Sequence, residues 1–164
     1  MRFVDVETAK ASDGVRVVLL KGVPSPWSQA AKAIFEIKGC DALAVWKSAG
    51  PDAVSAWTGV PNAPVVMFAN EPPRSGWAEI LALAERLAPK PALVPSDIET
   101  RIRMFGLSHE LMGQQGLAAN LRLMIVDSSI ASQGQRGFSL PVASISASVT
   151  ATARIRSKPR ARRS

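Results

Sequence analysis

The pattern of apolar and polar positions divides the first 90 residues into short alternating strands and helices. Apolar runs predict strands at residues 15–20, 41–47 and 65–69, and the first run is rich in β-branched residues, as in a buried strand. Apolar residues at helical spacing predict helices at residues 25–38 and 77–87, and the short stretch 50–57 is interpreted as a brief helix. The stretch 70–76 predicts a loop with at most a short edge strand, because proline cannot occupy a central strand. The strand–helix–strand start implies a crossover between parallel strands.

Local signals mark the start of the first helix and the end of this region of alternating strands and helices. Ser25 precedes Pro26, and a serine N-cap followed by proline at the first helical position is a typical helix start. Residues 89–95 contain three prolines, which cannot lie inside a helix. This stretch therefore predicts a linker.

A second helical region follows the linker. Ser96 and Glu99 fit a capping box that opens a long helix to about residue 128, in which Gly113 and Gly116 favour a bend. We expect this helix to expose an apolar stripe, which favours homodimer formation or aggregation. Residues 139–164 change to Ser, Ala, Thr and Arg without a helical stripe and predict a disordered basic tail. The abrupt change indicates a truncated or frame-shifted reading frame.

Composition and charge restrict the possible functions. The net charge is +7, and six basic side chains in the last eleven residues account for all but one of these charges. The body is therefore nearly neutral and has no obvious anionic partner. No apolar run reaches the roughly 18 residues of a membrane span, and no secretory signal is evident. The single cysteine forms no intramolecular disulfide, so we expect a cytoplasmic protein.

The order of elements carries a family likeness. The segments Pro24-Ser25-Pro26-Trp27-Ser28 and Asn62-Ala63-Pro64-Val65-Val66, in their places before the first helix and the third strand, resemble the thioredoxin-fold domain of glutathione transferases. The linker and the helix after it are similar to the bridge into that family's all-helical domain. The resemblance implies an α/β fold. Its expected parts are a lead-in at 1–13, a thioredoxin-like domain at 14–88, the linker at 89–95, a partial helical domain at 96–138 and the disordered tail at 139–164.

The resemblance also implies functional residues. Ser25 falls where the family has a catalytic Ser or Cys, and a hydroxyl beside a helix N-terminus can stabilise a thiolate. Ser28 is a second hydroxyl on the same turn and a weaker catalytic candidate. The Ala63–Pro64 bond corresponds to the family's cis-proline and is expected to present the Ala63 backbone to the cysteinyl part of glutathione.

One family motif is missing. The acidic–serine pair that binds the γ-glutamyl end of glutathione is replaced here by Gly76-Trp77. Arg74 and Ser75 lie just before this position, and with the free N–H groups of the following helix they could still bind a carboxylate. The four tryptophans are interpreted as core residues.

The leading hypothesis is therefore a glutathione-transferase-like enzyme that binds glutathione and conjugates its thiolate to a small hydrophobic electrophile. We expect no metal site, because His109 is the only histidine and has no cysteine nearby in the sequence. Two alternatives stay open. One is a non-catalytic, degenerate thioredoxin-fold binding module. The other is nucleic-acid binding by the basic tail, which is less favoured because the tail lacks aromatic residues and a folded reader.

Overall fold

The computed structural model describes residues 1–48 and 52–147, and these residues divide into two compact units at the boundary between Ala118 and Ala119. The first unit contains a four-stranded sheet in the order β1-β3-β2-β4. The strands are β1 (Arg2–Phe3), β2 (Val15–Leu20), β3 (Ala42–Lys47) and β4 (Val65–Met67). β1 and β2 each pair parallel with β3, whereas β4 pairs antiparallel with β2. The sheet is therefore mixed, as the crossover and the later loop indicate.

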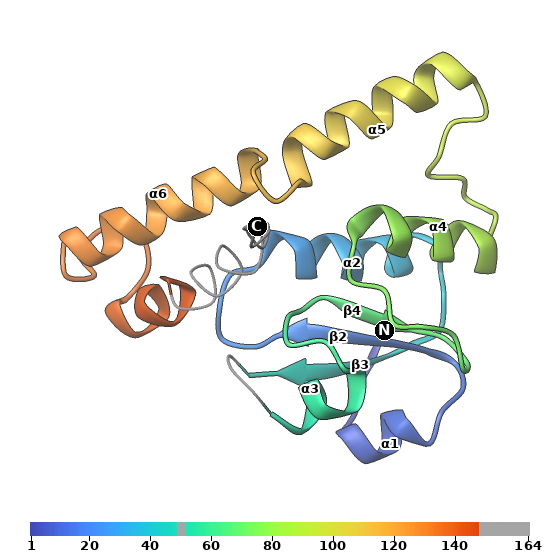
Figure 1. Cartoon of the computed structure of the whole chain (residues 1–164), viewed down its shortest axis with the longest axis horizontal. Coiled ribbons are helices and arrows are strands. Elements are labelled where there is room, and N and C mark those ends of the chain that lie inside the picture. Colours follow the sequence, from blue (N-terminus) through green and yellow to red (C-terminus); the bar gives the residue numbers. More distant parts are fainter. Residues whose placement is uncertain (49–51, 148–164) are drawn as a thin grey trace, which may run out of the picture. The chain divides into compact units, whose positions relative to one another are not determined.

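Helices cover both faces of the sheet (Figure 1). The helices of this unit are α1 (Val6–Lys10), α2 (Pro26–Ile37), α3 (Ala53–Thr58), α4 (Trp77–Leu87) and α5 (Ile98–Met112). Val17 belongs to a buried cluster with Phe35 of α2 and Ile80 of α4. The next residue, Val18, joins Val54 of α3 on the opposite face. This alternation explains why β2 is apolar on both faces.

The N-terminal lead-in, residues 1–13, contributes the edge strand β1 of the sheet. The sequence indicated only a lead-in before residue 14, but Arg2 and Phe3 pair with Leu43 and Ala44, and α1 follows. Ala9 of α1 is fully buried in the cluster that contains Val18. A two-residue strand has no periodicity to detect, so its pairing is visible only in the folded chain.

The loop at 70–76 contributes one β-bridge. The backbone N–H groups of Val66 and Arg74 each donate to the other's carbonyl, at 2.8 and 2.9 Å. The prolines at 72 and 73 precede this bridge. The expected short edge strand is thus reduced to a single residue pair.

The single long helix expected from residue 96 is two helices, α5 and α6 (Leu117–Ala131). Asp97, not Ser96, is the N-cap of α5, and its carboxylate accepts the N–H of Thr100 at 2.8 Å. At the break, a Cβ on Gly113 would lie 2.5 Å from the carbonyl oxygen of His109. Because that approach is too close for any other residue, the chain leaves the helix where only glycine fits.

In the second unit, α6 is followed by a turn and a helical segment at residues 140–147. Ser129 Oγ accepts the N–H of Phe138 at 2.8 Å, and Val126 and Ala143 are buried. The sequence predicted disorder from residue 139, whereas residues 140–147 form a helical segment in which the small side chains of Ala143 and Ser146 are fully buried. Residues 148–164, which hold the rest of the expected basic tail, lie outside the described residues.

The described residues lack the features of a membrane-spanning helix and of a clustered metal site. None of their helices combines the length and the apolar character that crossing a bilayer requires. The same part of the chain contains no group of three or more His, Cys, Asp or Glu side chains placed to hold a metal ion.

Candidate functional site

Ser25 is the N-cap of α2, as the sequence predicts. Its backbone is extended, with φ −132° and ψ 102°, and its Oγ accepts the N–H of Ser28 at 3.2 Å. Pro26 occupies the first helical position, where its missing N–H costs nothing. Ser25 is 4 % exposed, and no described residue accepts its hydroxyl proton. The O–H group therefore keeps its donor capacity beside the positive end of the helix.

Ser28 lies one turn later and faces the sheet. It is 3 % exposed, and its Oγ accepts the N–H of Leu20 at 3.3 Å. This bond joins the end of β2 to the first turn of α2. The contacts of Ser28 are thus those of a residue that positions the helix, and Ser25 is the better placed of the two hydroxyl groups.

The segment before β4 approaches the start of α2. The Ala63–Pro64 peptide bond is cis, which confirms the expectation from the resemblance. Pro64 is buried, and Val65 begins β4 directly after it. Neither the N–H nor the carbonyl of Ala63 is hydrogen-bonded to another described residue. Backbone N–H and C=O groups in folded proteins are normally hydrogen-bonded. The N–H and carbonyl of half-buried Ala63 are therefore available to a ligand.

Arg74 is held inside its own loop. One guanidinium nitrogen donates to Glu71 at 2.5 Å and another donates to the Pro72 carbonyl at 3.3 Å. Arg86 of α4 also donates to both carboxylate oxygens of Glu71, at 2.6 and 2.7 Å. The hydrogen bonds from Arg86 and Arg74 lower the pKa of Glu71 below its ordinary range. The charge of Arg74 is therefore already matched within the protein.

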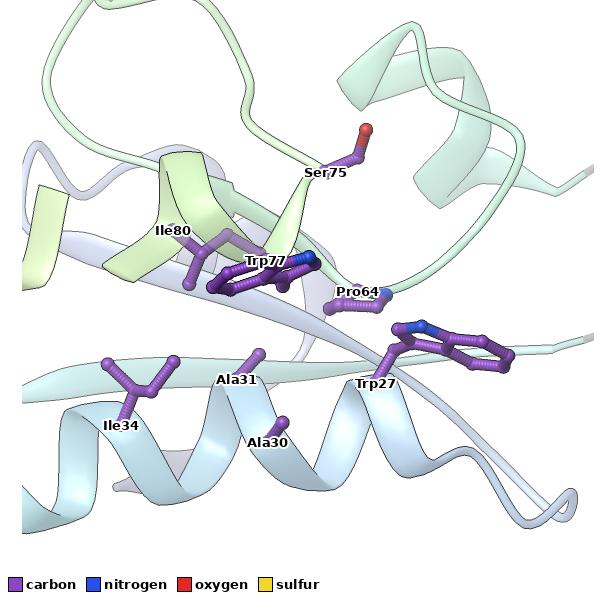
Figure 2. Close-up of a pocket in the computed structure, with 8 residues that line it drawn as sticks. All are labelled: Trp27, Ala30, Ala31, Ile34, Pro64, Ser75, Trp77 and Ile80. Atoms are coloured by element: carbon purple, nitrogen blue, oxygen red, sulfur yellow. The ribbon is translucent and has the colours of Figure 1, made fainter. Parts of the chain in front are cut away.

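Ser75 is exposed at the start of α4. Gly76 is the N-cap of this helix and offers no side-chain acceptor, while the carboxylate of Glu79 accepts the Gly76 N–H at 3.3 Å. In Figure 2, the Ser75 hydroxyl points away from the neighbouring indole rings. Ser75 thus lies beside the site, with its oxygen directed outward.

A shallow apolar hollow lies where α2, Pro64 and the start of α4 meet (Figure 2). Its enclosed volume is about 10 Å³, which is room for roughly one water molecule. The hollow is lined by Trp27, Ala30, Ala31, Ile34, Pro64, Ser75, Trp77 and Ile80. Among the residues expected from the sequence, it brings Pro64 and Ser75 together, and Ser25 is two residues before Trp27.

Sequence reasoning missed the part that Trp27 and Trp77 play here, because it assigned all four tryptophans to the core. Both are only half-buried and border the hollow. The indole N–H of Trp27 donates to the Met112 carbonyl at 2.6 Å, and the ring of Trp77 lies 5.8 Å from that of Phe105. The one signal of this role in the sequence was that both tryptophans lie at the start of a predicted helix.

Comparison with known proteins supports one assignment of fold. No protein-family description and no curated protein matches the sequence. Among solved structures, a glutathione S-transferase from Methylobacterium radiotolerans, in complex with glutathione sulfonate, is similar with a TM-score of 0.56 and 16 % identity. The match covers 87 % of this chain and 64 % of that one. The chain has the glutathione-transferase fold.

A Tau class glutathione S-transferase from mango, Mangifera indica, is similar with a TM-score of 0.51 and 16 % identity. Here the match covers 87 % of this chain and 60 % of the mango enzyme. The chain therefore spans less than two-thirds of the length of either transferase. Within this fold, β2, α2, β4 and α4 form the thioredoxin-like layer that contains Ser25 and Pro64.

Proposed function

We propose that this chain binds glutathione and transfers its thiolate to a small hydrophobic electrophile. One observation carries the proposal: a buried serine at the N-terminus of α2 and the unpaired backbone of Ala63 occur in a chain with the glutathione-transferase fold. The similar enzyme from M. radiotolerans was solved with glutathione sulfonate. The likeness supports glutathione as the co-substrate, and no metal is required.

In the proposed reaction, Ser25 stabilises the thiolate. Its hydroxyl donates a hydrogen bond to the glutathione sulfur, and the N-terminal N–H groups of α2 add positive potential. Both effects lower the pKa of the bound thiol and raise its nucleophilicity near neutral pH. With chlorodinitrobenzene, the C–S bond forms as the C–Cl bond breaks, chloride leaves, and the thiol proton passes to water.

Ala63 holds the peptide in this proposal. Its free N–H and carbonyl pair in a strand-like manner with the cysteinyl residue of glutathione, which places the sulfur near Ser25. The missing acidic–serine pair leaves the γ-glutamyl end to Ser75 and to the first N–H groups of α4. Arg74 can assist only by giving up part of its bond to Glu71.

Two further parts of the proposal concern partners and location. Ile98, Ile102, Leu107 and Leu111 of α5 are exposed, which supports self-association as a homodimer. The single cysteine and the proposed use of glutathione fit the reducing cytosol.

A second candidate is a non-catalytic thioredoxin-fold module. One observation favours it: Ser25 is nearly buried and its Oγ already caps α2, so capping alone accounts for a serine at this position. In this case the chain would keep the fold without the reaction.

Isothermal titration calorimetry with reduced glutathione and with S-methylglutathione tests the proposal. We expect both peptides to bind the full chain, and glutathione to elute it from glutathione-agarose. Because the bound thiol is expected to have the lower pKa, reduced glutathione should bind more tightly as the pH rises from the pKa of the bound thiol toward that of the free thiol. The affinity of S-methylglutathione, which has no thiol, should not change in this way. Absence of binding by a folded chain would exclude the transferase proposal and leave the non-catalytic module.

A further inference from the structure

Arg122 is a buried cation in the second unit. It lies on the face of α6 that also carries Val126 and Ser129, and all three residues are buried. Arg122 itself is 8 % exposed, and one of its terminal nitrogens donates to the Ser146 carbonyl at 3.3 Å. A guanidinium taken out of water needs hydrogen-bond acceptors and a negative charge in place of its hydration. One long hydrogen bond to a carbonyl supplies only a small part of this.

The described residues provide no counter-charge for Arg122. Its Nε–H is buried and donates to none of them, and no carboxylate among them forms an ion pair with its guanidinium. Asp127 is the only acidic side chain in residues 119–164, and it is exposed. Burial lowers the pKa of Arg122 below its ordinary value, and no neighbouring charge opposes this effect. Because an arginine still keeps its charge at neutral pH, the buried charge calls for an anion.

Arg16 of β2 shows how this chain satisfies another buried guanidinium. Arg16 is 6 % exposed, and its two terminal nitrogens donate to the carbonyls of Ser12 and Ala69 at 2.5 and 2.7 Å. Within the described part of the chain, Arg122 makes one such bond, and a longer one. Both arginines have a buried Nε without a hydrogen-bond partner there. The two therefore differ in the acceptors at their terminal nitrogens, and this difference singles out Arg122.

The charge of this part of the sequence also favours anions. Residues 119–164 contain eight basic side chains and one acidic side chain and thus carry the whole net charge of +7, whereas residues 1–118 contain twelve of each. Such a positive region raises the local concentration of anions and their rate of association. One guanidinium balances one negative charge, so a carboxylate suits Arg122 better than a phosphate monoester, which carries about −1.5 to −2 at pH 7.

We propose that Arg122 binds the carboxylate group of a small molecule. The Nε–H and a terminal N–H donate to the two carboxylate oxygens, because the edge of a guanidinium matches a planar carboxylate in a bidentate pair. Since Arg122 is only 8 % exposed, the ligand reaches it with a narrow carboxylate end. The carboxylate replaces the lost hydration of the guanidinium and so stabilises the contact between α6 and residues 140–147. This site lies in the second unit and is independent of the proposed transferase function.

Nitrogen-15 NMR of the arginine Nε–H groups tests the proposal on the full, unmutated chain. Each signal is assigned through bonds from the backbone amide of its own residue. The probe is sodium acetate, and sodium chloride and sodium methyl phosphate at equal ionic strength are the comparisons. We expect acetate to shift the Arg122 signal saturably and to leave the signals of buried Arg16 and exposed Arg136 in place. No saturable shift of Arg122, or an equal shift with chloride or methyl phosphate, would overturn the proposal.

Two variants of Arg122 and a matched control add an independent measurement. Arg122→Lys keeps the charge but loses the planar fork, so it should weaken acetate binding about tenfold, the effect of one lost hydrogen bond to a charged group. Arg136→Lys should bind acetate as the unmutated chain does. Acetate should raise the melting temperature of the unmutated chain relative to chloride, and this difference should vanish in Arg122→Met.

The opposite result is equally clear. If Arg122→Met raises the melting temperature and acetate has no effect on the unmutated chain, Arg122 is a buried charge that only costs stability, and the proposal fails. The acetate titration of the unmutated chain remains decisive even where a variant does not fold.

Discussion

The indole N–H of Trp27 donates a hydrogen bond of 2.6 Å to the backbone carbonyl of Met112, 85 residues away in the chain. This bond joins the first turn of α2 to the last residue of α5. No residue of α5 is fully buried, so the helix has little apolar burial to hold it in place. The contacts of Trp27 and Trp77 therefore help to hold α5 against the rest of the first unit.

Replacing Trp27 with phenylalanine removes this bond and keeps an aromatic ring. We expect Trp27→Phe to lower the free energy of unfolding by about 1 kcal/mol, the usual net value of one hydrogen bond. Amide hydrogen exchange should accelerate in α5 more than in β2. Trp46→Phe is the matched control, because Trp46 on β3 is exposed and its ring stacks on Phe3 of β1. Equal exchange rates in α5 of both variants would argue against this attachment.

The sequence predicted the thioredoxin-like layer in detail because its signals are local. β2 coincides with the apolar run at 15–20, and α4 coincides with the helical stripe at 77–87. Ser25 and Pro26 cap α2 as expected. Each of these features depends on neighbouring residues alone, so tertiary contacts did not alter them.

The second half was less predictable for physical reasons. Ser96 and Asp97 are both good N-caps, and only the fold decides that Asp97 binds Thr100. The break at Gly113 depends on how closely the backbone approaches His109. In the candidate site, the position of Arg74 just before α4 could be predicted from the sequence, but its ion pair with Glu71 could not. Trp27 and Trp77 are half-buried because of tertiary contacts between α2, α4 and α5, which are distant in the sequence.

Lys38 connects α2, α4 and the linker. Its side chain is 0 % exposed, and its Nζ donates to Glu85 and, at 2.7 Å, to the Pro91 carbonyl. Lys38→Met should lower the free energy of unfolding by about 3 kcal/mol, because it leaves a carboxylate and a carbonyl without their donor. Urea denaturation measures the loss. Lys32→Met is the control on the same helix: Lys32 pairs with Glu36 at 3.8 Å on the surface, so its loss should cost at most about 0.5 kcal/mol.

Glu85 makes the stability of this clamp depend on pH. Desolvation acts to raise its pKa, but the hydrogen bonds from Lys38 and from the Leu93 N–H outweigh it, and the pKa lies below its ordinary value of 4.5. A carboxylate with a lowered folded pKa stabilises the fold fully above the unfolded value and loses this contribution as the pH falls through the folded value. The melting temperature should thus decline below about pH 4.5.

Glu85→Gln keeps an oxygen that can accept the Leu93 N–H but does not titrate. The variant should be less stable at pH 7 and should show a smaller decline between pH 5 and pH 3, as measured by thermal melts in matched ionic strength. Glu36→Gln, on the exposed face of α2, should keep the original slope. An unchanged slope in Glu85→Gln would show that other carboxylates carry the acid sensitivity.

Leu107 and Leu111 form an exposed apolar pair one turn apart on α5, with 66 % and 49 % of their surface accessible. If this face supports self-association, the double change Leu107→Glu and Leu111→Glu should shift the chain toward monomer, because two charges cannot be buried in an apolar contact. Sedimentation velocity over a range of concentrations measures the shift. Ile37→Glu changes an exposed residue on α2 and should have no effect. A wild-type chain that is monomeric throughout would refute the homodimer.

A series at Ser25 separates catalysis from helix capping. Ser25→Ala removes both the cap and the hydroxyl, and should cost about 1 kcal/mol of stability. Ser25→Asp keeps an acceptor for the Ser28 N–H, but its carboxylate repels a thiolate. Ser25→Thr keeps both the cap and the donor. With glutathione and chlorodinitrobenzene, kcat/KM should fall at least about a hundredfold in Ser25→Asp at near-normal stability, and should recover in Ser25→Thr, in line with the loss of one donor to a developing charge. If Ser25→Asp conjugates as fast as the unmutated chain, Ser25 only caps α2 and the thiolate is stabilised elsewhere.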